Sequence, residues 1–276
     1  MSARPVILTS GDPSGIGPEI AVKACLAGER FVWLGDPRHL PPGVAWREVT
    51  DLAELVPNRV LPVLRHDFAA PALPGQPDPA NAAGVIAVIE RAVALVQAGE
   101  AAAICTAPIH KKALKDGAGF AFPGHTEFLA HLAAVERVVM MLACPNLRVV
   151  PVTIHISLAD VPGALTEGLL EETIRITHAG LIRDFGIPAP RLAIAGLNPH
   201  AGEGGAMGWE EERLIRPLVA RLEAEGMAIR GPMSADTMFH AAARKGYDTA
   251  ICMYHDQALI PIKTIDFAGG VNVTLG

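Results

Sequence analysis

Val149-Val150-Pro151-Val152-Thr153-Ile154-His155 is the stretch that decides the fold, because it is an apolar, β-type run that ends in a histidine. The same arrangement occurs twice more, where His200 follows the run Leu192–Ala195 and His255 follows the run Ala250–Met253. Short apolar runs of this kind are typical of buried strands in a parallel sheet. Ligands of such sheets bind beyond the carboxyl ends of the strands. Three imidazoles placed there could therefore meet at one divalent metal ion.

Strand-type and helix-type runs alternate along the rest of the chain. The further strand-type runs are Val6–Thr9, Phe31–Leu34 and Ala102–Thr106, and the helix-type runs are Pro18–Leu26, Pro79–Ala98, Glu167–Phe185 and Trp209–Glu225. Asp78 before Pro79 is a typical helix start, and Pro217 is expected to bend the last of these helices. The alternation predicts βαβ units and a mainly parallel sheet, which is an α/β fold.

The composition excludes several classes of protein. The chain has 276 residues, of which 50% are hydrophobic and 19% charged, so one large or two smaller domains with a sizeable core are expected. The net charge of −6 argues against non-specific binding of nucleic acid. The four cysteines form no Cys-x-x-Cys pair, which favours free thiols in a reducing compartment. Without an evident signal peptide or an uninterrupted apolar span, we expect a cytoplasmic protein that does not enter a membrane.

Two turns could bind an anion. The segment Gly11–Glu19 joins a predicted strand to a predicted helix, but it lacks the Gly-Lys-Ser/Thr of a phosphate-binding loop. It is either a tight structural turn or a phosphate cradle, and we favour the turn. In the segment Gly124–Glu127, Thr126 either caps a helix or joins His125 in binding a phosphate or carboxylate.

Four further polar residues remain open to two interpretations. Asp236 could cap a helix or belong to a site. Asp256 could orient the neighbouring imidazole of His255 or act as a base. Lys263 lies in an apolar run, as either a solvated lysine on an edge strand or a partner of a phosphate. Asn272 is similarly ambiguous.

Together these segments resemble one family, that of 4-hydroxythreonine-4-phosphate dehydrogenase of vitamin B6 biosynthesis. The matching stretches are Gly11–Glu19, Thr106–Lys111, Gly124–Glu127, Thr153–His155, Gly196–Gly205, Tyr254–Gln257 and Gly270–Gly276. They span nearly the whole chain in the family's order. The Asn-Pro-His-Ala-Gly-Glu and Tyr-His-Asp-Gln segments are the most specific of them.

The resemblance implies a homodimer of subunits with two α/β/α domains and a cleft, related in fold to isocitrate and isopropylmalate dehydrogenases. The active site would lie in the cleft at the subunit interface and draw on both subunits. We expect the first domain at residues 1–122 together with 262–276, and the second at 123–261. In the family the chain continues beyond the position of Gly276, with an arginine that binds substrate and an Asp-His-Gly-Thr-Ala-like loop. We therefore expect a further C-terminal part.

The resemblance also implies a role for each candidate residue. The divalent metal, which is Zn, Mg, Co or Mn, would be held by His155, His200 and His255. The small phosphorylated amino-acid substrate would be bound by His125, Thr126, Lys263 and Asn272. Asp236 and Asp256 match acidic residues of the site, and either is a candidate for the catalytic base. The expected cofactor is NAD or NADP.

The expected reaction is metal-dependent oxidation of 4-phosphooxy-L-threonine at C3, followed by decarboxylation to 3-amino-2-oxopropyl phosphate. A sibling dehydrogenase of erythronate or threonate 4-phosphate would keep the same metal and phosphate sites. A zinc-dependent hydrolase would also use three histidines with nearby aspartates. A non-catalytic protein that binds phosphate or metal is a third alternative, although it would leave Asp236, Asp256 and Lys263 without a purpose.

Overall fold

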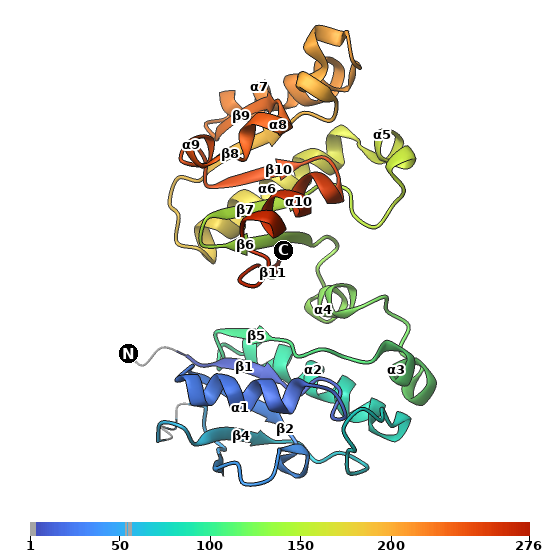
Figure 1. Ribbon diagram of the computed structural model, residues 1–276, viewed down its shortest axis with the longest axis vertical. Helices are drawn as coiled ribbons and strands as arrows, with labels where there is room; N and C mark the ends of the chain where they lie inside the picture. The colour runs from blue at the N-terminus through green and yellow to red at the C-terminus, as the bar shows by residue number, and fades with distance from the viewer. Residues whose placement is uncertain (1–3, 53, 55–56) are drawn as a thin grey trace. The chain divides into compact units, whose positions relative to one another are not determined.

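The structure is a computed structural model that describes residues 4–52, 54 and 57–276. The chain divides into two compact units, unit 1 over Met1–Glu136 and unit 2 over Arg137–Gly276 (Figure 1). Each unit contains one sheet, and neither sheet shares a strand with the other. The α/β class predicted from the alternation of strands and helices is confirmed.

Unit 1 is built on a five-stranded, entirely parallel sheet in the order β3-β4-β2-β1-β5. Its strands are β1 Val6–Thr9, β2 Phe31–Gly35, β3 Trp46–Glu48, β4 Leu61–Arg65 and β5 Ala103–Cys105. Its helices are α1 Gly17–Ala27, α2 Ala82–Gln97, α3 Lys111–Ala118 and α4 His125–Ala133, with the 3-10 turns η1 Pro37–His39 and η2 Pro79–Asn81.

Helices cover both faces of this sheet. Alternate strand residues point to opposite faces: Ile7 joins the cluster formed by α2, α3 and α4, whereas Leu8 joins the cluster under α1. The helical segment Pro79–Gln97 has a mean hydropathy of 1.5 and is long and apolar enough to cross a membrane, contrary to our expectation. Val88 and Ile89 on this segment are buried in the core of unit 1, so it is a core helix of that unit.

Asp36, directly after β2, connects two loops of unit 1 by hydrogen bonds. Its fully buried carboxylate accepts a hydrogen bond of 2.6 Å from the Arg38 guanidinium and one of 2.9 Å from the Phe68 N–H. Burial raises the pKa of this carboxyl, but the bonds from Arg38 and from the backbone outweigh it and lower the pKa to about 2. The folded pKa thus lies below the ordinary value of 3.8.

We expect Asp36→Asn to destabilise the chain by about 1–3 kcal/mol at pH 7, because an amide cannot accept all of these hydrogen bonds. A lowered folded pKa gives stabilisation that is complete above the ordinary pKa and is lost as the pH falls towards 2. The difference between the urea concentrations at which wild type and variant are half unfolded should therefore become smaller from pH 5 to pH 3. Asp67→Asn, which removes an exposed partner of Arg65, is the control. A difference that does not change with pH would contradict this account.

Unit 2 is built on a six-stranded sheet in the order β11-β6-β7-β10-β8-β9. Its strands are β6 Val139–Cys144, β7 Leu147–Pro151, β8 Arg191–Ala195, β9 Ala228–Met233, β10 Thr249–Cys252 and β11 Val271–Leu275. Strands β7, β10, β8 and β9 are parallel, whereas β6 pairs antiparallel with both β7 and β11. Its helices are α5 Val161–Ala164, α6 Glu167–Arg183, α7 Arg216–Ala224, α8 Ala235–Met238, α9 Ala241–Arg244 and α10 His255–Ile265, with the 3-10 turns η3 Leu158–Asp160 and η4 Pro199–Gly205 and the π-helical turn η5 Glu211–Ile215.

Unit 2 also has three layers. Ile194 and Ile251 face a core formed with α6 and α7, whereas their neighbours Ala193 and Cys252 face α8 and α10 (Figure 1). The predicted last helix begins with the π-helical turn η5 and continues as α7. Pro217, at the start of α7, has no N–H to donate into the preceding turn, which accounts for the irregularity expected there.

The division between the units differs from our expectation in two places. Helix α4 belongs to unit 1, because Phe128 packs against Phe120 with ring centroids 5.2 Å apart. Residues 262–276 belong to unit 2, because Asn272 of β11 pairs with Leu142 of β6. Pairing between strands so distant in the sequence leaves no local signal, so the pattern of apolar residues alone could not reveal it.

Candidate functional site

The three histidines lie at one edge of the unit 2 sheet. Strands β7, β10 and β8 are adjacent and parallel, so their carboxyl ends meet at the same edge. His155 follows β7, His255 is the first residue of α10 after β10, and His200 lies in η4 after β8. The next strand, β9, is followed by α8, which carries Asp236. Four neighbouring strand ends thus each supply one candidate residue to this edge, where α/β sheets bind ligands.

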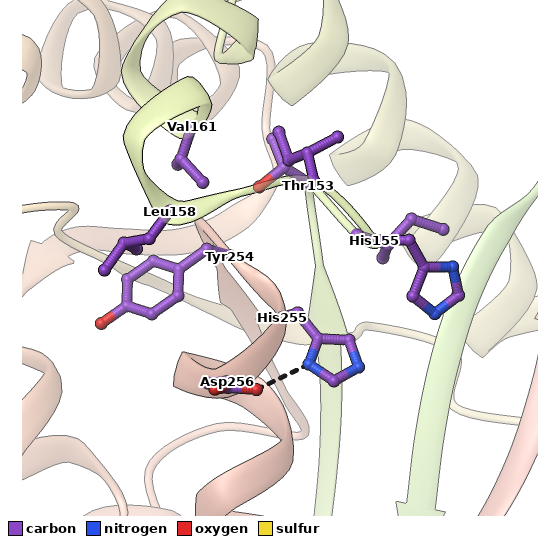
Figure 2. A pocket seen from close by; sticks show the side chains of 9 residues that line it. Thr153, His155, Leu158, Val161, Tyr254, His255 and Asp256 are labelled. Carbon is purple, nitrogen blue, oxygen red and sulfur yellow. Dashed lines mark hydrogen bonds and ion pairs between the residues drawn. The ribbon is translucent and has the colours of Figure 1, made fainter.

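His155 and His255 are close neighbours in space. Their ring centroids lie 5.7 Å apart, and both line a cavity of about 220 Å³ (Figure 2). The Nδ1 atom of His255 lies 2.7 Å from Oδ1 of Asp256, so the carboxylate fixes the orientation of this ring and leaves Nε2 free. A histidine that binds a metal is commonly oriented by a carboxylate in this way. Leu158 and Tyr254 form an apolar side of the cavity, away from the two imidazoles.

The segment that precedes His155 is hydrogen-bonded to the residue that follows β10. The backbone N–H and the side-chain hydroxyl of Thr153 both donate to the carbonyl oxygen of Met253, at 3.2 and 2.8 Å. His155 itself has a φ of 34°, in a left-handed region that residues other than glycine rarely adopt. Such backbone strain persists only where surrounding contacts impose it, and it is common at functional sites.

His200 lies on a separate loop. Its φ is 53°, and its side chain is exposed. The side chain of Ser234 donates a hydrogen bond to Asp236. This bond, and to a smaller extent the charge of His200, lowers the pKa of Asp236. Asp236 therefore faces the loop that carries His200, as an ionised carboxylate at neutral pH.

The positions of the three histidines indicate whether a metal ion could bind between them. With Zn–N bonds of about 2.0–2.1 Å, two ligating imidazoles in a tetrahedral site have ring centroids roughly 5 Å apart. The spacing of 5.7 Å between His155 and His255 is close to that value, and both rings line the same cavity. His200 does not complete the set: among the described residues, no group of three or more His, Cys, Asp or Glu side chains could hold a metal ion. One chain therefore offers two of the three expected ligands in one place.

Lys263 lies on a helix rather than on an edge strand. It is in the last turn of α10 and lines a second cavity, of about 330 Å³, together with His255 and Asp256. Helix residues spaced by four lie on one face, so His255, Leu259 and Lys263 share a face of α10. The Nζ atom of Lys263 lies 5.8 Å from the ring centroid of Phe267. The two cavities thus share the wall formed by His255 and Asp256.

Asn272 lies apart from these cavities. It is an exposed residue of the edge strand β11, opposite Leu142 of β6, and it lines neither of the two cavities described above. The structure therefore brings Lys263, but not Asn272, into a cavity with the predicted metal histidines.

His125 and Thr126 are the first two residues of α4 in unit 1. The N-cap residue is Gly124 and no side chain caps this helix, so the interpretation of Thr126 as its cap is wrong. The ring of His125 is largely buried, and its Nε2 atom is buried without a hydrogen-bond partner. Burial, and then the charge of Lys111, lowers the pKa of this imidazole, so it is neutral at pH 7 rather than protonated. Lys111 is a cation that the sequence analysis did not single out. A Cβ at Gly124 would lie 3.5 Å from Oε2 of Glu127 and 3.6 Å from Lys111 Nζ, so a carboxylate and an ammonium group both stand beside the start of α4.

The glycine-rich turn near the N-terminus is structural. Gly11 has a φ of 67°, and a Cβ added at Gly17 would lie 2.1 Å from the carbonyl oxygen of Ser10. Asp12 closes the turn, because its Oδ1 accepts a hydrogen bond of 2.8 Å from the Ser14 N–H. His110, in another segment of the resemblance, caps α3 by accepting a hydrogen bond from the Ala113 N–H.

Comparisons with known proteins show what this chain is similar to. The family model described as pyridoxal phosphate biosynthetic protein PdxA matches residues 30–276. Relatives named 4-hydroxythreonine-4-phosphate dehydrogenase include those of Paracoccus denitrificans and Roseobacter denitrificans. They are 66% and 63% identical, over 99% and 100% of this chain and 86% of each relative. A solved structure of the Klebsiella pneumoniae enzyme of that name is similar with a TM-score of 0.92 and 36% identity, over 99% of this chain and 88% of that one. A terephthalate 1,2-cis-dihydrodiol dehydrogenase from Burkholderia xenovorans is similar with a TM-score of 0.74 and 29% identity, over 99% and 86% of the two chains.

Proposed function

The chain belongs to the family of the pyridoxal phosphate biosynthetic protein PdxA, and from this membership we propose that it is a 4-hydroxythreonine-4-phosphate dehydrogenase. It is an oxidoreductase of pyridoxine biosynthesis. The observation that carries the proposal is that histidines and aspartates end four neighbouring strands of unit 2, in a chain of this family. The substrate proposed is 4-phosphooxy-L-threonine.

The chemistry proposed follows from the structure of that substrate. The C3 hydroxyl loses a proton and C3 loses a hydride, so that a ketone forms at C3. The carboxylate is then β to the ketone, so that loss of CO2 gives 3-amino-2-oxopropyl phosphate. When bound, a divalent metal would polarise the C3 oxygen as a Lewis acid, and a nicotinamide cofactor, NAD or NADP, would accept the hydride.

His155 and His255 would hold the metal, and His200 would be the third ligand. Neutral imidazoles suit this task, because they leave the full charge of a Zn, Mg, Co or Mn ion to act on the oxygen; three nitrogen ligands favour the softer of these metals. Because the described residues of one chain do not bring the three histidines together, we propose a homodimer whose site at the subunit interface is completed by the partner. This arrangement agrees with the exposure of His155 and His200.

The two aspartates would have different tasks. Asp256 orients the ring of His255, which supports a role in holding the metal ligand in place. Asp236 is not bonded to an imidazole, and its lowered pKa keeps it ionised near His200. We propose Asp236, directly or through a water molecule, as the group that takes the C3 hydroxyl proton.

The phosphate of the substrate would be held by cationic and polar groups. Lys263 lines the cavity that also contains His255, which supports its role as a phosphate partner. His125, with its unpaired buried Nε2, and Thr126 supply hydrogen-bonding groups at the start of α4, and Asn272 is proposed as a further contact. The net charge of −6 agrees with a partner that is a small molecule rather than a nucleic acid. We propose a cytoplasmic location and no association with a membrane.

An assay of nicotinamide reduction tests this function. The expected result is formation of NADH, or of NADPH, with 4-phosphooxy-L-threonine, and a higher kcat/KM for it than for erythronate or threonate 4-phosphate. Preference for a sugar-acid phosphate would assign the chain to a sibling dehydrogenase. Release of phosphate or another hydrolysis product without reduction of the cofactor would indicate a metal-dependent hydrolase and contradict the proposal.

A further inference from the structure

The loop that carries His200 is folded around one buried carboxylate. Glu211 is completely buried. Its Oε1 accepts a hydrogen bond of 2.7 Å from the backbone N–H of Asn198, and its Oε2 accepts one of 2.9 Å from the Asn198 side-chain amide. That amide also donates to Oε2 of Glu210, at 2.8 Å. A carboxylate removed from water must have its oxygens hydrogen-bonded, so Glu211 and Asn198 hold each other in one arrangement.

Three glycines allow the backbone of this loop to close on the carboxylate. A Cβ at Gly202 would lie 2.6 Å from Oε2 of Glu211, and a Cβ at Gly196 would lie 3.1 Å from Oε1. A Cβ at Gly208 would lie 2.2 Å from Nδ2 of Asn198. The glycines around His200 thus mark the places where the loop touches the Glu211–Asn198 pair.

The loop needs this support, because its backbone is strained. The five residues from His200 to Gly204 all have positive φ, between 43° and 75°. Each residue with a side chain costs about 1–2 kcal/mol in this conformation, and Ala201 and Glu203 are two such residues in addition to His200. Glu211 itself begins the π-helical turn η5, a backbone form frequent at functional sites.

Gln257 attaches the beginning of the same loop to the turn that carries His255. Its Nε2 donates a hydrogen bond of 2.8 Å to the carbonyl oxygen of Gly196, and its Oε1 accepts one of 2.7 Å from the Met253 N–H. The side chain is buried and lies in the first turn of α10, two residues after His255. One amide group therefore bridges the ends of β8 and β10.

We propose that Glu211 and Gln257 are positioning residues that set the place of His200 relative to His255. Glu211 holds the loop through Asn198, and Gln257 fixes the start of the loop to α10. Neither side chain lines the two cavities at this edge of the sheet. The inference rests on the proposed function only where metal binding serves as a readout, since the order of the loop can be measured without a metal.

The first test measures the loop directly, by hydrogen–deuterium exchange of the metal-free chain. Glu211→Gln keeps the shape of the side chain, but its amide cannot accept from both donors of Asn198. We expect peptides covering 197–205 to exchange about tenfold faster, with no change in the core strands. Glu212→Gln is the matched control, because Glu212 is the next residue and pairs with Arg216 at the surface. Unchanged exchange in 197–205, or equal acceleration throughout unit 2, would overturn the inference.

The second test measures the affinity for Zn²⁺ by competition with a chelator. Glu211→Gln and Gln257→Glu should each weaken binding about 10–100-fold, as loss of a group that orients a ligand does, while Glu212→Gln has no effect. Gly202→Ala keeps the carboxylate but pushes the loop away from it, so it should give the same loss and replaces Glu211→Gln if that variant does not fold. Wild-type affinity in these variants would overturn the inference. If wild type itself binds no Zn²⁺, the proposed zinc site fails, and the exchange result still decides the positioning role.

Discussion

Replacing His255 by alanine is expected to lower kcat/KM at least about 1000-fold, because the Lewis acid contributes several kcal/mol to the transition state. His255 lines both cavities together with Asp256, and its ring is already oriented by Asp256 at 2.7 Å. Its removal leaves His155 without its neighbour 5.7 Å away. The measurements are initial rates of NADH formation and the metal content of the purified protein by elemental analysis.

Removing the metal from the wild-type chain with a chelator should cause the same loss of kcat/KM. Adding Zn²⁺, Co²⁺, Mn²⁺ or Mg²⁺ should reverse this loss. In His255→Ala the added metal should restore nothing. His178→Ala is the matched control, since His178 lies on α6 of the same unit and lines neither cavity. We expect the same behaviour of His200→Ala as of His255→Ala. An alanine variant that retains its metal and most of its activity would exclude that histidine as a ligand.

The second large effect is expected at Lys263. Lys263→Met keeps the length of the side chain but removes its charge, and a hydrogen bond to a charged group contributes about 1.5–3 kcal/mol. We therefore expect the KM for the phosphorylated substrate to rise about 10–100-fold, with a smaller change in kcat. Steady-state kinetics over a wide range of substrate concentration will separate the two parameters.

The control for Lys263→Met is Lys245→Met, which removes an exposed charge after α9 in the same unit. A second comparison uses inorganic phosphate as a competitive inhibitor, which should bind less tightly to Lys263→Met than to wild type. An unchanged KM together with a large fall in kcat would mean that the ammonium group acts on the reacting atoms. It would then not be the anchor of the phosphate.

The placement of the three histidines after strands could be predicted because it follows from local patterns. Val6–Thr9 was predicted with the bounds that β1 has; the run before His200 is one residue shorter than β8, and the run before His255 is displaced by one residue from β10. Short apolar runs bounded by turn residues are the strongest strand signals that a parallel sheet leaves in a sequence. The order β7-β10-β8, which puts the three ends side by side, is a long-range property and could not be read from them.

Lys263 shows where the local pattern misleads. The run from Ile260 to Thr264 is rich in β-branched residues and contains Pro261, both of which disfavour the interior of a helix. Leu259 and Ile262 are nevertheless buried against the sheet of unit 2, and this packing outweighs the local preference.

Lys111, Glu211 and Gln257 were missed for a different reason. Each acts on residues distant in the sequence: Lys111 on His125, Glu211 on Asn198 and Gln257 on Gly196. Lys111 and Gln257 each carried a sequence signal, as the last residue of the matching segments Thr106–Lys111 and Tyr254–Gln257, whereas Glu211 carried none. Buried polar residues in the first turns of helices that follow such strands are the ones to examine in similar chains.

Helix α10 carries both the imidazole of His255 and the ammonium group of Lys263, which are eight positions apart in the sequence. At about 1.5 Å per residue, their attachment points are separated by roughly 12 Å along the axis. With the roles proposed for these two residues, this spacing would fix the distance between the metal ligand and the phosphate partner. Substrate analogues that are one methylene longer or shorter should therefore be discriminated by length, whatever group they carry at C2.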